Sequence, residues 1–372
     1  MTDLITAPEL HVSHVGLLAV PGPTTARAPI DAVIVPTARP AVWLTRAIRL
    51  AEELGAPLIA LCSQDADPSA VHDKSWECDA TVIAAAVSTL RPQALPRLGT
   101  TSLIAESPFR RASDTSVKRN VALAVSRMTG WRRVLFLDDD ISGVTADAVR
   151  EAASWLGPFD VVGLSNGGYF DNSVVCHANR DTGGVQETFV GGGAMLFSGA
   201  PTASFFPDIY NEDWFFLLGS DRLRKVAASG TYRQERYDPY ANAVRARQEE
   251  FGDTLAEGIY ALLDDRGTVS DADADYWRAF LPRRAEFIDA VAERVCATVP
   301  AGLRQTRMIA ALRASRASLD LITPDLCVKY LRAWRRDRRR WAEYLDTLKP
   351  DRSPGEALAW LGLKVWETTG AR

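Results

Sequence analysis

The chain has 372 residues, of which 47% are hydrophobic and 24% are charged, and its formal net charge is −4. This is the composition of a globular protein with a sizeable core, and the slightly acidic balance argues against a nucleic-acid-binding protein. The five cysteines are widely spaced and form no C-x-x-C pair, so the sequence predicts neither a disulfide framework nor a zinc site, and we expect a cytoplasmic protein. No basic region precedes the short apolar run near the N-terminus, and no apolar stretch approaches the roughly 18 residues of a membrane span, so we expect neither a signal peptide nor a transmembrane helix.

Strand and helix signals alternate over the first part of the chain. After a lead-in rich in Pro, Gly and Thr, DAVIVPTARP predicts a strand stopped by Pro36, and residues 41–54 predict a helix that ends at Gly55. PLIALCS and ATVIAAAV predict two further buried strands.

The clearest helix signal lies in SDTSVKRNVALAVSRMTG, with Ser113 or Asp114 as N-cap and Gly130 at the end. It leads into the apolar strand VLFL, and a further helix over residues 145–156 precedes the strand DVVGLS. This alternation predicts an α/β fold with a mostly parallel sheet. Ligands of such sheets bind beyond the carboxyl ends of the strands, where residues 36–40 and 138–140 fall.

From about residue 240 the strand signals stop. The remaining segments predict helices, and we expect a helical C-terminal region that packs on the first domain or forms a small domain. We find no internal repeat.

Three consecutive aspartates follow the strand in VLFLDDDI. Because neighbouring carboxylates repel one another, this arrangement costs stability unless a cation offsets it. On an extended segment Asp138 and Asp140 share one side and Asp139 points to the other. Hard oxygen ligands select Mg²⁺ or Mn²⁺, which completes its coordination with waters and phosphates. The alternative is that the acids solvate a turn or cap the next helix; we favour the metal because a turn needs only one of them.

With these stretches in view, the sequence resembles glycosyltransferases of the GT-A fold that use nucleotide sugars, particularly the large inverting family 2. The resemblance rests on IVPTARP, KRNVALAV, VLFLDDDI, and the pair VGGGAMLF and NEDWFF, and it covers residues 31 to about 230. It implies a GT-A-like (Rossmann-like) α/β domain over residues 30–240, with a mixed, mostly parallel sheet flanked by helices. Residues 1–29 are then an N-terminal lead-in and residues 241–372 the helical C-terminal region.

The resemblance also implies a role for each matched residue. The first loop would hold the nucleotide base, the helix segment would meet the ribose or diphosphate, and the triple glycine would lie beside the sugar and acceptor. Asp140 and Asp138 would hold the metal. The donor-binding residues so implied are Pro36, Thr37, Arg39, Lys118, Arg119, Asn120, Asp138, Asp139, Gly191, Gly192 and Gly193. The helix by itself leaves open that Lys118 and Arg119 form a solvated face, and the glycines fit a tight turn equally well.

NEDWFF supplies the catalytic residues that the resemblance implies. Asp213 would be the general base that deprotonates the acceptor hydroxyl, and Glu212 would orient the base or the acceptor. An aspartate is already ionised at pH 7, so no large pKa shift is required. The same residues also suit the acidic first turn of a helix, and both roles are compatible.

The implied function is metal-dependent transfer of a sugar from a UDP- or GDP-sugar to an unknown acceptor hydroxyl, with inversion. The alternatives are a retaining GT-A enzyme, a sugar nucleotidyltransferase, a haloacid-dehalogenase-like phosphatase in which the first Asp is a nucleophile, and a non-catalytic nucleotide-binding protein. No histidine follows Asp213 to act as a further metal ligand, and His177 is interpreted as a hydrogen-bonded histidine near the acceptor cleft. The Q-x-x-R-W signature of processive synthases is absent, so we expect a non-processive enzyme.

The run RAWRRDRRRW over residues 332–341 combines arginines with an approximate apolar stripe. It suits a long surface helix that is apolar inside and basic outside, which we prefer. The alternative is weak contact with an anionic membrane surface or acceptor.

Overall fold

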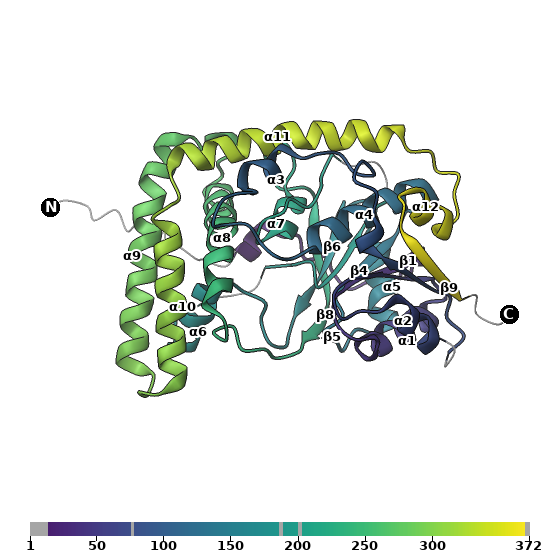
Figure 1. Cartoon of the computed structure of the whole chain (residues 1–372), viewed down its shortest axis with the longest axis horizontal. Helices are drawn as coiled ribbons and strands as arrows, with labels where there is room; N and C mark the ends of the chain where they lie inside the picture. The colour runs from purple at the N-terminus through teal and green to yellow at the C-terminus, as the bar shows by residue number, and fades with distance from the viewer. Residues whose placement is uncertain (1–13, 76–77, 186–188, 200–202, 369–372) are drawn as a thin grey trace.

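The computed structural model describes residues 14–75, 78–185, 189–199 and 203–368, so residues 1–13 of the expected lead-in lie outside the described residues. Within that part of the chain, nine strands form one sheet in the order β5-β8-β6-β7-β4-β1-β2-β3-β9 (Figure 1). The strands are β1 (Ala32–Thr37), β2 (Leu58–Cys62), β3 (Val82–Ala86), β4 (Val134–Leu137), β5 (Ile141–Ser142), β6 (Val161–Asn166), β7 (Ala194–Phe197), β8 (Val226–Gln234) and β9 (Lys364–Thr368).

The sheet is mixed, as expected. Strands β3, β2, β1 and β4 run parallel to one another, whereas β7 is antiparallel to both β4 and β6. Strand β8 returns to a parallel pairing with β6. The carboxyl ends of β1 and β4 therefore meet at one edge of the sheet, where the segments 36–40 and 138–140 come together.

Pro36 does not stop β1, which continues to Thr37. On one side Pro36 is in register with Leu61 of β2, but pairing with β4 on the other side ends at Ile34. The missing N–H of proline is tolerated because the ladder on the β4 side has already ended.

Helices flank the sheet. They are α1 (Thr45–Leu54), α2 (Pro68–Ser75), α3 (Gly99–Ile104), α4 (Thr115–Thr129), α5 (Ala146–Ser154), α6 (Val174–Asp181), α7 (Glu212–Leu217), α8 (Ala243–Asp264), α9 (Ala274–Thr298), α10 (Leu303–Leu319), α11 (Pro324–Thr347) and α12 (Pro354–Trp360), with 3-10 turns η1 (His14–Leu17), η2 (Ala41–Leu44), η3 (Val87–Thr89) and η4 (Val269–Asp271). The period-2 alternation of β1 divides its side chains between two cores. Ala32 and Ile34 face the cluster shared with α4 and the C-terminal helices, whereas Val33 and Val35 face the cluster shared with α1 and α5.

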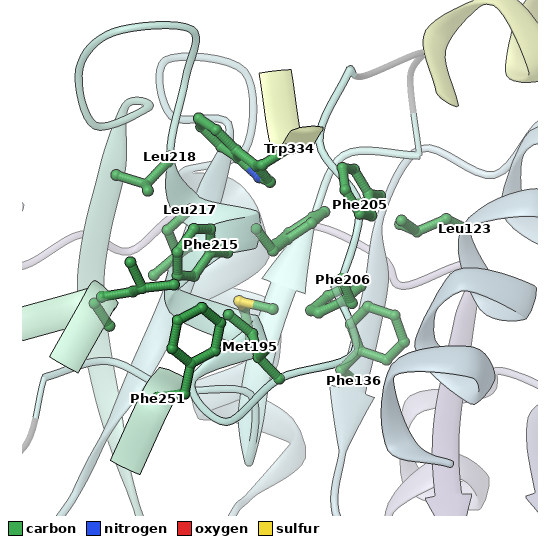
Figure 2. Packing of buried hydrophobic residues seen from close by; sticks show 14 of the residues in the cluster. Leu123, Phe136, Met195, Phe205, Phe206, Phe215, Leu217, Leu218, Phe251 and Trp334 are labelled. Atoms are coloured by element: carbon green, nitrogen blue, oxygen red, sulfur yellow. The ribbon is translucent and has the colours of Figure 1, made fainter. Parts of the chain in front are cut away.

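The C-terminal helices share a core with the first domain. Figure 2 shows Phe136 of β4, Met195 of β7, Phe215 of α7, Phe251 of α8 and Trp334 of α11 in one cluster, with Met195 between Phe136 and Phe215. All five side chains are buried. Burial of this apolar area holds the helical region against the sheet, so it packs on the first domain rather than around a core of its own.

The arginine-rich run lies in α11, the long helix along the top of Figure 1. Trp334 and Trp341 are fully buried beneath the run, while Arg332, Arg336 and Arg339 are exposed, which confirms the preferred interpretation of a surface helix. Its one acid, Asp337, is buried and caps the start of α3, because its carboxylate accepts hydrogen bonds from the N–H groups of residues 99 and 100, each 2.8 Å long. Within the described residues, none of the helices combines the length and the hydropathy needed to cross a bilayer.

The expectation that no strand follows residue 240 is wrong. Strand β9 pairs antiparallel with β3 and forms an edge of the sheet. Its five residues, KVWET, are too few to give a periodic signal, and β3 supplies the pairing from 278 residues earlier in the chain, counted from Ala86 to Lys364. The strand is therefore decided by a long-range contact.

Candidate active site

The three aspartates occupy the turn that follows β4. Asp139 accepts a hydrogen bond from the Thr37 hydroxyl (2.7 Å) and pairs with Arg39, and Asp140 accepts a bond from the same guanidinium (3.0 Å). The expected alternation, with Asp139 opposite to Asp140, is therefore wrong. Residues 139 and 140 form a turn rather than an extended segment, which directs both carboxylates to Arg39.

Asp138 faces a different cation. Its two carboxylate oxygens lie 3.1 and 3.2 Å from Nη2 of Arg119. Burial, and to a lesser degree the charges of Asp140 and Asp139, raise the pKa of Asp138 to about 7, although the positive charge of Arg119 lowers it. Burial also raises the pKa of Asp140. Burial is therefore the main cause of both shifts, and the two arginines only partly oppose it.

The solvated-face interpretation of α4 is wrong, because Lys118 and Arg119 are 2% and 3% exposed. The Lys118 ammonium donates to the Thr37 carbonyl (2.8 Å) and the Ser63 hydroxyl (2.6 Å), and it pairs with Asp114. It therefore joins the ends of β1 and β2 to α4 and reaches the cavity beside the aspartates.

Asn120 does not reach either cavity of the site. Its side-chain amide donates to the carbonyl of Phe206 (2.8 Å) and accepts from the N–H of the same residue (2.9 Å). This pair of bonds fixes the segment before α7 against α4. The structure gives Asn120 a positioning role instead of the expected donor contact.

The triple glycine lies between Arg119 and Asp213. The φ angles of Gly191, Gly192 and Gly193 are not positive, so a special backbone conformation is not what glycine provides here. It provides space: a Cβ on Gly192 would lie 2.4 Å from the Arg119 guanidinium. The close approach lets the Gly192 N–H donate to the Asp213 carboxylate at 2.6 Å.

Asp213 stands in the first turn of α7. Its second carboxylate oxygen accepts from the Trp214 N–H (2.9 Å), so the backbone holds both oxygens. Burial, followed by the charge of Glu212, raises the pKa of Asp213 to about 6. At neutral pH the group is still mostly ionised, and it is a stronger base than an ordinary aspartate.

Glu212 is buried and bridges two arginines. Arg111 and Arg119 lie 3.0 and 3.1 Å from its two oxygens. Both acids at the start of α7 line the smaller cavity, but Glu212 binds arginines, whereas the oxygens of Asp213 accept bonds from backbone N–H groups.

Two cavities meet at this edge of the sheet. The larger, of about 520 Å³, is lined by Pro36, Arg39, Lys118 and all three aspartates. The smaller, of about 330 Å³, is lined by Arg119, Gly191, Gly192, Gly193, Glu212 and Asp213. The residues common to both cavities are Ser113, Thr115, Asp138, Asp171 and Arg245. Thr37 lines neither cavity, although it holds Asp139.

Sequence reasoning missed several residues of the site. Asp171 lines both cavities and accepts from Tyr237 (3.3 Å), and Tyr232 of β8 lines the smaller cavity. Arg245 comes from the helical region, which the sequence did not connect to the site. No local sequence pattern marks these residues, because they come from separate segments that only the fold brings together.

Carboxylates of the kind that bind a hard divalent cation line the larger cavity, although among the described residues their ligand atoms do not form a group within 4.8 Å of one another. Asp138, Asp140 and Asp171 line the larger cavity, and burial raises the pKa values of Asp138 and Asp140, so a cation bound there would favour their ionised forms. Carboxylates of this kind suit Mg²⁺ or Mn²⁺. Arg39 pairs with Asp139 and Asp140 and therefore neutralises part of the negative charge of these carboxylates.

His177 is hydrogen-bonded, as expected. Its Nε2 lies 2.9 Å from the Tyr237 hydroxyl, and its ring stacks on Tyr169. Burial, together with the charges of Arg180 and Arg245, lowers the pKa of His177 to about 3, so the ring is neutral.

The far wall of the smaller cavity is held by His14. The imidazole contacts Asp264 and Glu257 of α8, the latter at 3.2 Å. Burial alone lowers the pKa of His14, but the hydrogen bonds and charges of Asp264 and Glu257 outweigh it and raise the pKa from 6.5 to about 9.

This pair of contacts predicts a pH-dependent stability. The pKa of His14 is higher in the folded protein than in the unfolded chain. The stabilisation of the fold by these two contacts is therefore fully present below pH 6.5 and is lost as pH rises through 9. The free energy of unfolding should fall by up to about 3 kcal/mol over this range relative to His14→Gln. Urea unfolding of both proteins at pH 6.5 and 9.5 measures the difference; equal pH dependence in the two would contradict the assignment.

No protein-family model matches the chain, and no curated protein matches it. Among solved structures, the chain is similar to a mannosyltransferase from Pyrobaculum calidifontis in complex with GDP-mannose and Mn²⁺, with 14% sequence identity and a TM-score of 0.41. The match covers 86% of this chain and 88% of that chain.

Proposed function

We propose that this chain is a glycosyltransferase of GT-A type that uses a nucleoside-diphosphate sugar and a divalent metal, inverts the anomeric carbon and is non-processive. The observation that carries the proposal is the pair of confluent cavities. One is lined by the aspartates that would hold the metal and by basic groups, and the other by Asp213, whose pKa is raised and whose oxygens accept backbone N–H groups; both are lined by Asp138 and Asp171.

The larger cavity suits the nucleotide. Arg39, Lys118 and Arg245 bring positive charge to it, as a diphosphate requires, and Pro36 gives an apolar contact at the end of β1. Asp138 and Asp140 would hold the metal, which when bound would neutralise negative charge on the leaving diphosphate as a Lewis acid. UDP- and GDP-sugars are the donors that we propose.

The smaller cavity suits the sugar and the attacking hydroxyl. Asp213 would accept the proton of the acceptor hydroxyl as that oxygen attacks the anomeric carbon. The N–H groups of Gly192 and Trp214 keep the carboxylate aimed during this step. Arg119 lies between Asp138 and Glu212 and supplies positive charge where the two cavities meet. A single displacement with the base opposite the leaving group inverts the anomeric carbon.

The proposal predicts metal-dependent donor binding. In a thermal-shift screen, one UDP- or GDP-sugar should raise the melting temperature by several degrees in the presence of Mn²⁺ and not in its absence, since a ligand at 100 times its Kd adds about 2.7 kcal/mol. Asp140→Ala should abolish this shift. Asp147→Ala is the control, because Asp147 is an exposed carboxylate that pairs with Arg27 and lines neither cavity.

A shift that needs no metal, or one that persists in Asp140→Ala, would contradict the assigned ligands. The best-binding nucleotide sugar is then incubated with the protein, and the released nucleoside diphosphate is measured. Its release distinguishes an enzyme from a non-catalytic binding protein.

A further inference from the structure

The deep wall of the smaller cavity is formed by one face of α8. Glu249, Asp253 and Glu257 follow one another at intervals of four residues, so they lie on one side of the helix, and all three line the cavity. They are 4%, 2% and 5% exposed. Such a row of buried carboxylates is stable only when each has a partner.

Each carboxylate of this row contacts a cation. Arg245 pairs with Glu249, Arg284 donates to Asp253 at 2.6 Å, and His14 contacts Glu257 at 3.2 Å. Two of these cations are shared, because Arg284 also pairs with Glu250 and His14 also contacts Asp264. Each oxygen of Glu249 and Asp253 accepts one bond from the protein and has a second lone pair that can accept a hydrogen bond from a ligand.

The arginines of the smaller cavity are also paired. Arg111 and Arg119 both bond Glu212, and Arg245 bonds Glu249. Among the described residues, seven carboxylates and three arginines line this cavity, so its lining carries an excess of acidic groups. A phosphorylated or carboxylated acceptor would bring uncompensated negative charge to a wall of carboxylates.

Two phenol hydroxyls in this cavity point to a ligand. Tyr210 and Tyr232 are 9% and 3% exposed and both line the cavity. Neither hydroxyl has a hydrogen-bond partner in the part of the chain that the structure describes. Both hydroxyl oxygens are accessible from the cavity, so a ligand that enters it can take the hydrogen bonds that these hydroxyls otherwise make with water.

Tyr210 is held against α8 by a glycine. A Cβ on Gly252 would lie 2.2 Å from the Tyr210 carbonyl oxygen, so only glycine allows this approach. Burial, followed by the charges of Glu249 and Asp171, raises the pKa of the Tyr210 phenol, which keeps it protonated. The cavity thus combines hydroxyl donors with carboxylate acceptors.

We propose that this part of the cavity is the acceptor subsite and that it takes a neutral, polyhydroxylated unit, a sugar or a polyol. The hydroxyl groups of such a ligand can donate hydrogen bonds to the carboxylates and can accept hydrogen bonds from the two phenols. Trp214 and Phe189 line the same cavity and give a ring apolar contact. At about 330 Å³ the cavity is at the small end of ligand sites, so the unit that enters is small. The inference rests on the proposed function, because Asp213 in the same cavity is the base that would act on this hydroxyl.

A metal ion is the competing occupant. The ligand atoms of Cys176, Asp253 and Glu257 lie within 4.8 Å of one another. However, Asp253 is already paired with Arg284 and Asn211, and Glu257 is paired with His14. A metal ion bound at this position would be repelled by the positive charges of Arg284 and His14. The metal therefore enters the test as an outcome that would overturn the proposal.

The test is direct binding of neutral glycosides to the full chain. Methyl glucoside, methyl mannoside, methyl galactoside and glycerol are titrated by saturation-transfer NMR, with glucose 6-phosphate and octanol as the anionic and apolar comparisons. One neutral compound should bind, and Tyr210→Phe and Tyr232→Phe should each weaken it about three- to tenfold, the effect of one hydrogen bond. The melting temperature should not fall, because neither hydroxyl bonds the protein.

Tyr276→Phe is the matched control. Its hydroxyl donates to the Gly258 carbonyl at 2.6 Å outside the cavity, so this variant should lose stability but bind the glycoside normally. Three results would overturn the proposal: tighter binding of glucose 6-phosphate or octanol than of any neutral compound, unchanged binding in both cavity variants, or a stoichiometric metal ion that Cys176→Ser removes. Failure of the proposed function gives a different result. No nucleotide sugar would then raise the melting temperature, whereas the glycoside would still bind and Tyr210→Phe would still weaken that binding.

Discussion

Replacing Asp213 with asparagine is expected to lower the rate of glycosyl transfer by a factor of about 10²–10⁴, the contribution of a positioned general base. The amide cannot accept the acceptor proton, whereas its oxygen can still take one of the two backbone hydrogen bonds that now hold the carboxylate. Metal-dependent binding of the donor should persist, because Asp213 lines only the smaller cavity. Asp221→Asn is the control, since this acid lies outside both cavities and bonds the Ser270 N–H.

The unmutated enzyme should also show the titration of this base. Asp213 must be deprotonated to act, so at saturating metal the transfer rate should fall as pH drops through about 6 and level off above it. The rate measured from pH 5 to 8 with the donor identified in the thermal-shift screen checks this. Normal transfer by Asp213→Asn would remove the base and make the retaining alternative the better one.

Replacing Arg284 with alanine is expected to destabilise the fold by about 3–5 kcal/mol, because it leaves two buried carboxylates without their cation. The guanidinium donates to both oxygens of Glu250 (2.8 and 3.2 Å) and to Asp253 (2.6 Å), and the three side chains are at most 2% exposed. These bonds join α9 to α8, which carries the deep wall of the smaller cavity. Equilibrium urea unfolding measures the loss.

Two comparisons make the Arg284 measurement specific. Arg316→Ala removes an arginine of α10 that is paired with Asp289 and Asp320 near the surface, and it should cost less than about 1 kcal/mol. Replacing Arg284, Glu250 and Asp253 together by apolar residues should recover much of the stability, since no buried charge is then unpaired. A cost of less than 1 kcal/mol for Arg284→Ala would show that the two carboxylates find other partners.

Local patterns predicted most of the first domain. The strands β1, β2, β3, β4 and β6 and the helices α1 and α4 are found where apolar runs and periodic stripes placed them, and Gly55 and Gly130 end those helices in the left-handed conformation. These signals lie within single segments of about 15 residues or fewer, so they can be recognised without knowing the rest of the fold.

Other features depend on residues far away in the chain. The burial of Lys118 and Arg119 could not be inferred from α4, because their partners come from β1, the turn after β4 and α7. The direction of Asp139 was misjudged because a turn, set by contacts to Thr37 and Arg39, replaces the extended backbone. Strand β9 exists only because β3 offers an edge to pair with.

From the order of its residues alone, this protein's acidic turn, its glycine run and the acidic start of α7 could be recognised as the parts of one site, since charge repulsion and backbone space are local properties. Only the tertiary structure decided that α8 closes this site with three carboxylates, each matched to a cation from a different part of the chain: Arg245 from α8 itself, Arg284 from α9 and His14 from the N-terminal turn. Those pairings depend on which surfaces pack together, and packing is determined by the whole buried area of the fold rather than by any one segment.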